Sequence, residues 1–189
     1  MTKVNDYLWE IPHEPLPDDP PEVAILQRVF NLPLARALAE PLGELGYTLT
    51  SSDVLIPPDS DVTLDRRENY FRANVRFARH PRPDIVLRVH FEHTNWSHRL
   101  AQASHHTFYI NLDRFKLTDI TLRIPEPAWP GRLHTRMSSL PGTGLHYEGD
   151  DQEWFFTEEG GMDIQIARFL DKFRRLGEPW LSDERTYGG

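Results

Sequence analysis

The stretch from residue 70 to residue 93 places the strongest constraint on what this chain can fold into. Apolar side chains occupy every second position on both sides of a His-Pro-Arg-Pro segment at 80–83. Alternation with a period of two, interrupted by a proline-rich turn, predicts two antiparallel strands that each bury one face. The predicted core residues are Phe71, Ala73, Val75 and Phe77 in the first strand, and Ile85, Leu87, Val89 and Phe91 in the second.

Parity limits how these two strands can pair. Residues opposite each other share a face, so the odd-numbered core residues must pair with one another across an odd number of loop residues. Pairing Phe77 with Ile85 and pairing Phe77 with Leu87 both satisfy this condition. Each cross-strand pair contributes only about 0.2–1 kcal/mol, so side-chain pairing does not decide between them and both registers stay open.

The rest of the chain predicts helices before and after a sheet. Helical spacing covers 21–31, 33–45 and 161–176, and a long loop is expected at 125–143. Further strands are expected at 47–56, 62–64, 107–113, 117–124 and 152–157. This order predicts an α+β fold: an antiparallel sheet of about five to six strands, with N-terminal helices and a C-terminal helix packed on one face. We expect residues 1–21 to form a proline-rich arm and residues 22–189 to form a single domain.

Composition excludes some classes of function and disfavours others. The chain has no cysteine, which removes disulfide and thiolate chemistry, and it has neither a long apolar run nor a secretory signal pattern. We therefore expect a cytoplasmic protein without a membrane segment. The net charge of −8 argues against nucleic acid as a partner. Acidic residues crowd 10–22 and 148–159, whereas the central strands carry arginines.

Three short segments resemble a known family. They are residues 34–47, which end in Pro-Leu-Gly-Glu-Leu-Gly-Tyr, the Phe-Tyr-Ile-Asn-Leu strand at 108–112, and Gly-Glu-Pro-Trp-Leu at 177–181. The segments resemble a family of small bacterial α+β domains without an established activity, some of which are similar to immunity proteins found beside toxins. The resemblance implies mainly a fold, which does not by itself fix a function.

Polar residues on the other face of the predicted sheet form the first candidate site. Arginine, histidine and carboxylate side chains on neighbouring strands are suited to acid–base chemistry or phosphate binding. A half-exposed antiparallel sheet has such a polar face without any function, so the pattern alone does not establish a site. The candidate ligand-binding residues are Arg72, Asn74, Arg76, Arg88, His90, Glu92, Tyr109 and Asn111, with Asp113 on the same face.

Histidines cluster between residues 90 and 106, which raises the question of a metal. The order His-x-Glu-His lacks the helical zinc-binding spacing, and no cysteine ligand is present. On a strand, His90 and His93 point to opposite faces. We therefore expect no metal and no cofactor, with His93 buried at the edge of the core and His105 and His106 in a loop.

An acidic and aromatic segment near residue 150 forms the second candidate site. Such a composition suits an interface with a basic protein. We expect a non-catalytic binding protein of the immunity type, whose partner is another protein; the alternative is a ligand-binding domain or hydrolase that uses the polar face of the sheet. No nucleophile motif favours an enzyme, and the oligomeric state is not indicated. The candidate partner-binding residues are Tyr147, Glu148, Asp150, Asp151, Glu153 and Trp154.

Overall fold

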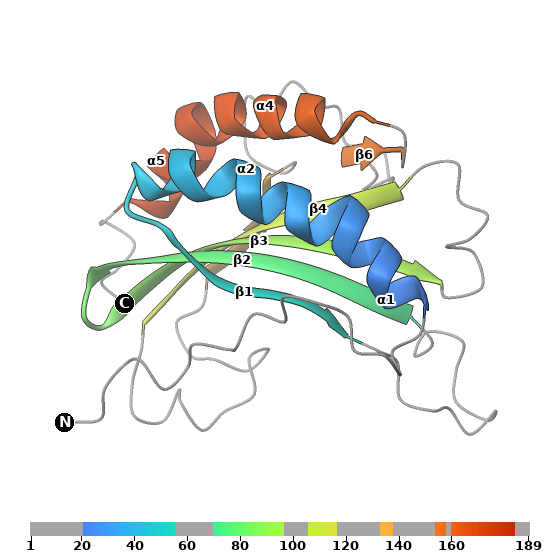
Figure 1. Ribbon diagram of the computed structural model, residues 1–189. Helices are drawn as coiled ribbons and strands as arrows, with labels where there is room; N and C mark the ends of the chain where they lie inside the picture. The colour runs from blue at the N-terminus through green and yellow to red at the C-terminus, as the bar shows by residue number, and fades with distance from the viewer. Residues whose placement is uncertain are drawn as a thin grey trace.

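The computed structural model describes residues 21–55, 70–96, 106–116, 133–137, 154–157 and 160–183. Two helical stretches lie on the same face of an antiparallel sheet (Figure 1). The arm up to residue 20, the strands expected at 62–64 and 117–124, and most of the loop expected at 125–143 fall outside the described residues.

The N-terminal helical stretch runs through Pro33 without a break. It consists of α1 (Pro21–Leu26), the π-helical segment η2 (Gln27–Asn31) and α2 (Leu32–Gly43). The sequence predicted two separate helices here, because proline lacks an N–H and its ring clashes with the carbonyl four residues back. The π-helical turn accommodates the proline: the N–H of Leu32 donates to the carbonyl of Gln27, five residues back.

The C-terminal helical stretch also accommodates a proline with a π-helical turn. It consists of α4 (Met162–Lys172), the π-helical segment η6 (Phe173–Gly177) and α5 (Glu178–Leu181). The N–H of Glu178 donates to the carbonyl of Phe173, and Pro179 follows directly. The helix predicted at 161–176 is therefore present but continues through a proline to Leu181.

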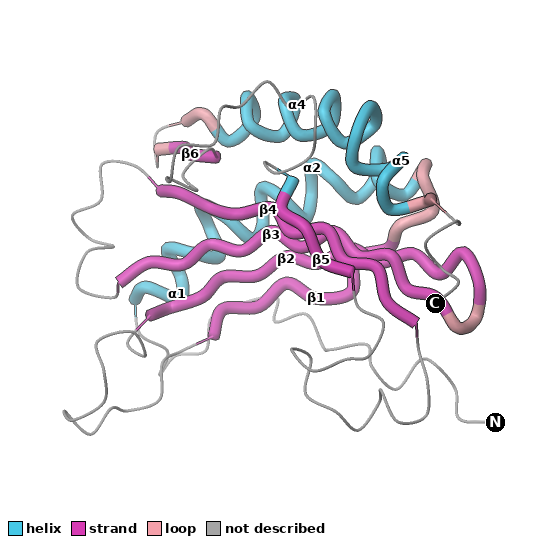
Figure 2. The backbone as a smooth tube through the Cα atoms, turned by 180° about the vertical axis from the view of Figure 1, so that it is seen from behind, coloured by secondary structure: helices cyan, strands magenta, loops and turns pink. Residues whose placement is uncertain are grey.

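The sheet confirms the α+β class. Its four long strands are β1 (Thr48–Leu55), β2 (Tyr70–Arg82), β3 (Ile85–Trp96) and β4 (His106–Lys116). They pair antiparallel. They lie in chain order, which the view from behind in Figure 2 also shows. Two short strands, β5 (Leu133–Arg136) and β6 (Trp154–Phe156), both pair with β4. β5 lies within the segment that the sequence predicted to be a loop.

The central hairpin has the predicted faces but neither of the predicted registers. Phe77 lies opposite Val89, so the odd-numbered residues do pair with one another. All the predicted core residues of this hairpin whose side chains are described are buried: Ala73, Val75, Phe77, Ile85, Leu87, Val89 and Phe91.

The turn explains the difference in register. The pairing shifts by one residue between Arg79 and Arg82, and Arg82 then pairs with Ile85, so that only Pro83 and Asp84 connect the strands. Proline fixes φ near −65°, which excludes the mirror-image turns that two-residue hairpins usually adopt. A bulge supplies extra twist. One bulged residue plus two turn residues gives the odd number that parity requires.

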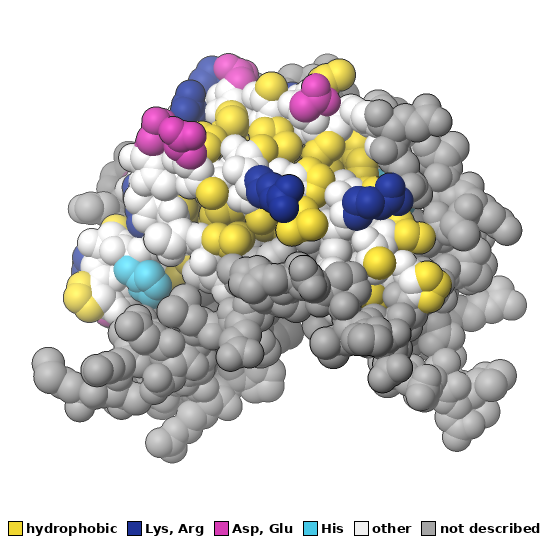
Figure 3. Space-filling model, viewed as in Figure 1, with side chains coloured by type: hydrophobic (Ala, Val, Ile, Leu, Met, Phe, Trp, Pro, Cys, Tyr) yellow, Lys and Arg dark blue, Asp and Glu magenta, His cyan; other side chains and the backbone are white. Residues whose placement is uncertain are grey.

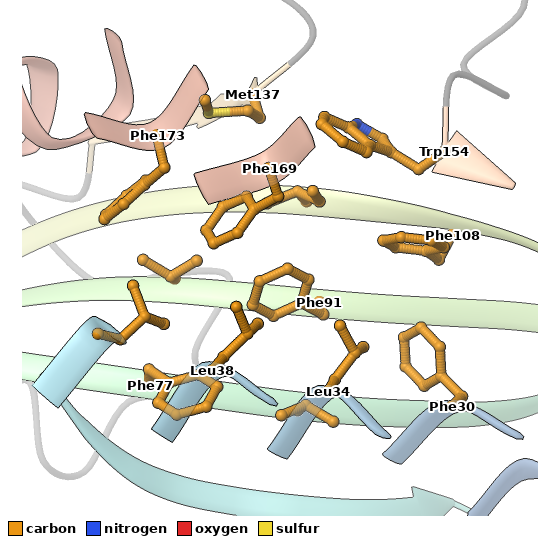
Figure 4. Close-up of a cluster of buried hydrophobic side chains, with 14 of the residues drawn as sticks. Phe30, Leu34, Leu38, Phe77, Phe91, Phe108, Met137, Trp154, Phe169 and Phe173 are labelled. Carbon is orange, nitrogen blue, oxygen red and sulfur yellow. The ribbon is translucent and has the colours of Figure 1, made fainter. Parts of the chain in front are cut away.

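Aromatic rings from the helical stretches meet those of the sheet to form the core (Figure 4). Phe169 packs edge-on against Phe91, with ring centroids 4.9 Å apart. Phe30 packs against Phe108 in the same manner at 5.4 Å. Fully burying side chains of this size stabilises a fold by about 1.5–3 kcal/mol each, so these contacts fix the helices on the apolar face.

The outer surface of the helical layer mixes apolar and charged side chains (Figure 3). Among the described residues, Ile164 on α4 is the one large hydrophobic residue that is exposed, with 65% of its surface accessible. None of the described helices combines the length and the apolar character that crossing a membrane requires.

Candidate functional site

The polar residues predicted on β2, β3 and β4 do lie on one face, opposite the helices. Strand pairing places them in rows that run across the sheet, with neighbours on adjacent strands about 4.8 Å apart. The side chain of Arg72 is outside what the structure describes. The rows are Arg76–His90–Asn111, Asn74–Glu92–Tyr109 and Ala78–Arg88–Asp113.

Arg88 and Asp113 form a buried ion pair at one end of this face. The Nε and Nη2 atoms of Arg88 both donate to Oδ2 of Asp113, at 3.0 and 2.8 Å. The two side chains are 9% and 0% exposed. Charges this deeply buried must be paired, because removing one of them leaves the other uncompensated in a medium of low polarity. Arg88 is therefore committed to Asp113.

A chain of hydrogen bonds orients His90. Oδ1 of Asn74 lies 2.9 Å from Nε2 of His90, and Nδ2 of Asn74 donates to Oδ1 of Asp53 at 2.9 Å. Since an amide oxygen only accepts, Nε2 of His90 must carry the proton. The sequence did not single out Asp53. It joins the site because β1 pairs Asp53 opposite Asn74.

Asn31 holds this end of the sheet from the side of the helices. Its Nδ2 donates to the backbone carbonyls of Asp53 and Asn74, at 3.0 and 3.1 Å, and to Oγ of Ser52 at 3.2 Å. Asn31 is 2% exposed and ends the π-helical segment η2. The helical layer therefore fixes the backbone that positions the Asp53–Asn74–His90 chain.

Glu92 and Asn111 are joined more weakly than the residues of the Asp53–Asn74–His90 chain. Nδ2 of Asn111 donates to Oε2 of Glu92 at 3.4 Å, which is long for a hydrogen bond. Glu92 and Tyr109 are half-buried, whereas Asn111 is buried. The carboxylate of Glu92 and the imidazole of His90 lie in different rows of the sheet.

The acidic segment proposed as a partner surface lies outside the described residues except for Trp154. Trp154 begins β6 and pairs with Phe108 on β4. Its side chain is 2% exposed, and the guanidinium of Arg168 lies 4.9 Å from the centre of its ring. Trp154 therefore belongs to the core rather than to a partner-facing surface, because β6 adds it to the apolar face of the sheet.

Two histidines meet inside the core, near one end of β3 and β4. Nε2 of His93 lies 3.1 Å from Nδ1 of His106, and the residues are 0% and 1% exposed. Burial, together with the nearby His106, lowers the pKa of His93 from 6.5 to about 3. His93 is buried as predicted. His106, which was expected in a loop, lies in β4 and stacks on Phe156.

The described residues contain no group of three or more histidine, aspartate or glutamate side chains that could hold a metal ion. Comparisons of the chain with protein-family models, with curated proteins and with solved structures give no match.

Proposed function

We propose that this chain is a non-catalytic binding protein, similar in mode of action to immunity proteins, that occludes a basic partner protein with its acidic segments. The observation that carries the proposal is an uneven distribution of charge. Residues 10–22 contain five Asp and Glu, residues 148–159 contain six, and neither range contains a Lys or Arg. These two acidic segments together carry −11, whereas the rest of the chain carries +3, because the whole chain carries −8. Such a concentration of negative charge favours association with a positive surface.

The polar face of the sheet supports a non-catalytic role. A general base must have a nitrogen or oxygen directed at a substrate proton, within about 3 Å. Here Arg88 bonds to Asp113, and Nε2 of His90 bonds to Asn74. These contacts direct the Arg88 guanidinium and Nε2 of His90 at neighbouring side chains of the sheet. They stabilise the sheet, which is the ordinary role of paired polar groups in a buried network.

The test begins with a partner captured from the source cell and identified, whose association with the purified chain is then followed in real time. In the acidic variant, Asp150, Asp151 and Glu153 are replaced by lysine. We expect its association rate to fall by about tenfold, and the rate for the native chain to fall as salt is added.

A matched variant separates the acidic segment from net charge alone. Replacing Glu40, Glu44 and Asp163 by lysine makes the same change of charge at exposed positions on a helix or directly after one. This control should associate at close to the native rate. Equal slowing in both triple variants, or no slowing in either, would reject the acidic segment as the interface.

A third variant addresses the enzyme alternative. Replacing His90 and Glu92 by glutamine removes the acid–base groups of the sheet while keeping their approximate shape. Partner association should remain unchanged. If the double replacement instead abolished partner inhibition or a measured turnover, the function would lie on the sheet and the binding proposal would fail.

A further inference from the structure

Arg76 differs from the other arginines of the central hairpin whose side chains are described. Arg79 bonds to Glu178, Arg82 to Asp84 and Arg88 to Asp113, each at 3.0 Å or less. The side chain of Arg76, in the middle of β2, makes no hydrogen bond or ion pair within the described part of the chain, and its Nε is buried without a partner. A guanidinium is always charged and carries five donors, so an unpartnered buried N–H is costly.

A second orphaned group lies directly opposite. Ser51 on β1 pairs with Arg76 on β2, is 2% exposed, and has a buried Oγ without a hydrogen-bond partner. Buried polar atoms are almost always bonded, so two unpartnered groups at one register position require an explanation such as a missing ion or ligand. Both groups can donate to an acceptor placed between them.

A bulge in β1 creates this juxtaposition. The pairing shifts between Leu49 and Ser51, and Thr50 is the extra residue. Oγ1 of Thr50 donates to the backbone carbonyl of Arg76 at 3.1 Å, which fixes the bulge against β2. Bulges often redirect a side chain at a functional site. Here the bulge sets Ser51 opposite Arg76, on the face that also carries His90.

We propose that Ser51 and Arg76 form a binding site for a small oxyanion, a carboxylate or a phosphate group. The fork of a guanidinium matches the paired oxygens of either group, and the serine hydroxyl would donate to one of those oxygens. Arg76 is half-buried, so an anion can reach the guanidinium from solvent. His90 is next to Arg76 in the row and borders the site. Its Nε2 is bonded to Asn74, so this atom does not donate to the anion. This site is separate from the acidic segments and from the proposed partner.

The experiment measures thermal unfolding of the full chain in inorganic phosphate or in acetate, against chloride at equal ionic strength. A protein that binds a ligand only when folded is stabilised as the ligand is added. We expect one of the two anions to raise the melting temperature. Phosphate also stabilises folded proteins without binding to a site, so only a response that Arg76→Gln loses counts as binding. Such a response confined to phosphate assigns a phosphate group as the ligand, whereas one confined to acetate assigns a carboxylate.

Four variants then test the assignment. Arg76→Lys keeps the charge but loses the fork, and Arg76→Gln loses both, so we expect affinity for the anion to fall by about tenfold or more. Ser51→Ala should weaken binding by a few-fold without loss of folding. Arg82→Gln, at an exposed arginine of the same strand, is the control and should bind as the native chain does.

Native-like anion binding by both Arg76→Gln and Ser51→Ala would overturn the proposal. The absence of any shift in the native chain with either anion would overturn it as well. Neither result depends on the partner protein, so the two proposals can fail separately.

Discussion

The hydroxyl of Tyr47 donates a 2.6 Å hydrogen bond to the carboxylate of Glu178, which lies 131 positions later in the chain. Arg79 completes the cluster: its Nη2 lies 2.9 Å from the other oxygen of Glu178, and its Nη1 donates to the carbonyl of Leu45. The turn after α2, the strand β2 and the C-terminal helical stretch are therefore joined at one point. The Leu-Gly-Tyr and Gly-Glu-Pro-Trp-Leu segments, noted separately in the sequence, meet in this cluster.

Tyr47→Phe tests what the hydrogen bond contributes. The ring would keep its edge-on contact with Phe173, at 5.8 Å, so the change removes only the hydroxyl. A hydrogen bond to a charged group contributes about 1.5–3 kcal/mol, and we expect the free energy of unfolding in urea to fall by about that amount. Glu178→Gln should cost a similar amount, and the double variant should cost less than the sum. Strict additivity would show that the two residues do not interact.

Gly46 is the left-handed turn residue between Leu45 and Tyr47, which both belong to this cluster. Its φ is +84°, and a Cβ there would lie 3.1 Å from Cδ of Arg79. Gly46→Ala should lower the free energy of unfolding by about 1–2 kcal/mol, because a left-handed conformation is strained for residues with a Cβ. Gly43→Ala, at the end of α2, is the matched control: its added Cβ meets nothing within 4 Å. Urea unfolding should show the control to be unchanged or slightly more stable.

Alternation along the strands was sufficient to predict the faces of the sheet, since burial on one side dictates which residues are apolar. It was insufficient for the register, which depends on a bulge that moves the turn to Pro83 and Asp84. The sequence pattern was also insufficient to predict where the helices end. Pro33 and Pro179 were predicted to lie at or beyond helix ends, but π-helical turns accommodate both.

The candidate site was predictable only for residues on the strongly patterned strands. Asn74, His90 and Asn111 lie where the alternation placed them. Ser51 and Asp53 were missed, because β1 reads Thr-Leu-Thr-Ser-Ser-Asp and a bulge decides which of these polar side chains meets β2. Trp154 was assigned to the wrong surface because a three-residue strand gives too short a pattern to reveal which face is buried.

The ion pair between Arg88 and Asp113 should be costly to break from one side. Arg88→Met removes the guanidinium that bonds to the fully buried carboxylate of Asp113, and we expect a loss of about 3–5 kcal/mol in the free energy of unfolding. Replacing Asp113 by leucine in the same molecule removes the uncompensated carboxylate and should recover much of that loss. If the double variant is as unstable as Arg88→Met, then altered packing, rather than the uncompensated charge of Asp113, accounts for the loss in the free energy of unfolding.

The buried histidine pair predicts how stability depends on pH. The pKa of His93 is lowered to about 3 in the folded state, mainly by burial, against 6.5 when it is exposed. Between these values the unfolded chain binds a proton that the folded chain excludes. The free energy of unfolding is therefore unaffected by this group above about pH 6.5, and it falls as pH is lowered from there toward 3. One proton contributes a slope of at most about 1.4 kcal/mol per pH unit.

Replacing both members of the pair isolates this effect. The variant His93→Phe with His106→Phe removes the titrating groups, leaves neither histidine without its partner, and retains the stacking of an aromatic ring on Phe156. Carboxylates also titrate below pH 5, so the informative quantity is the loss of stability from pH 7 to pH 5 in each protein. We expect the native chain to lose about 2 kcal/mol more than the variant. His80→Gln, at an exposed histidine on the hairpin whose pKa is also lowered by partial burial, should remove only a smaller part of the pH dependence. Equal losses of stability in the native chain and the double variant would show that the histidine pair binds a proton as readily in the folded chain as in the unfolded chain.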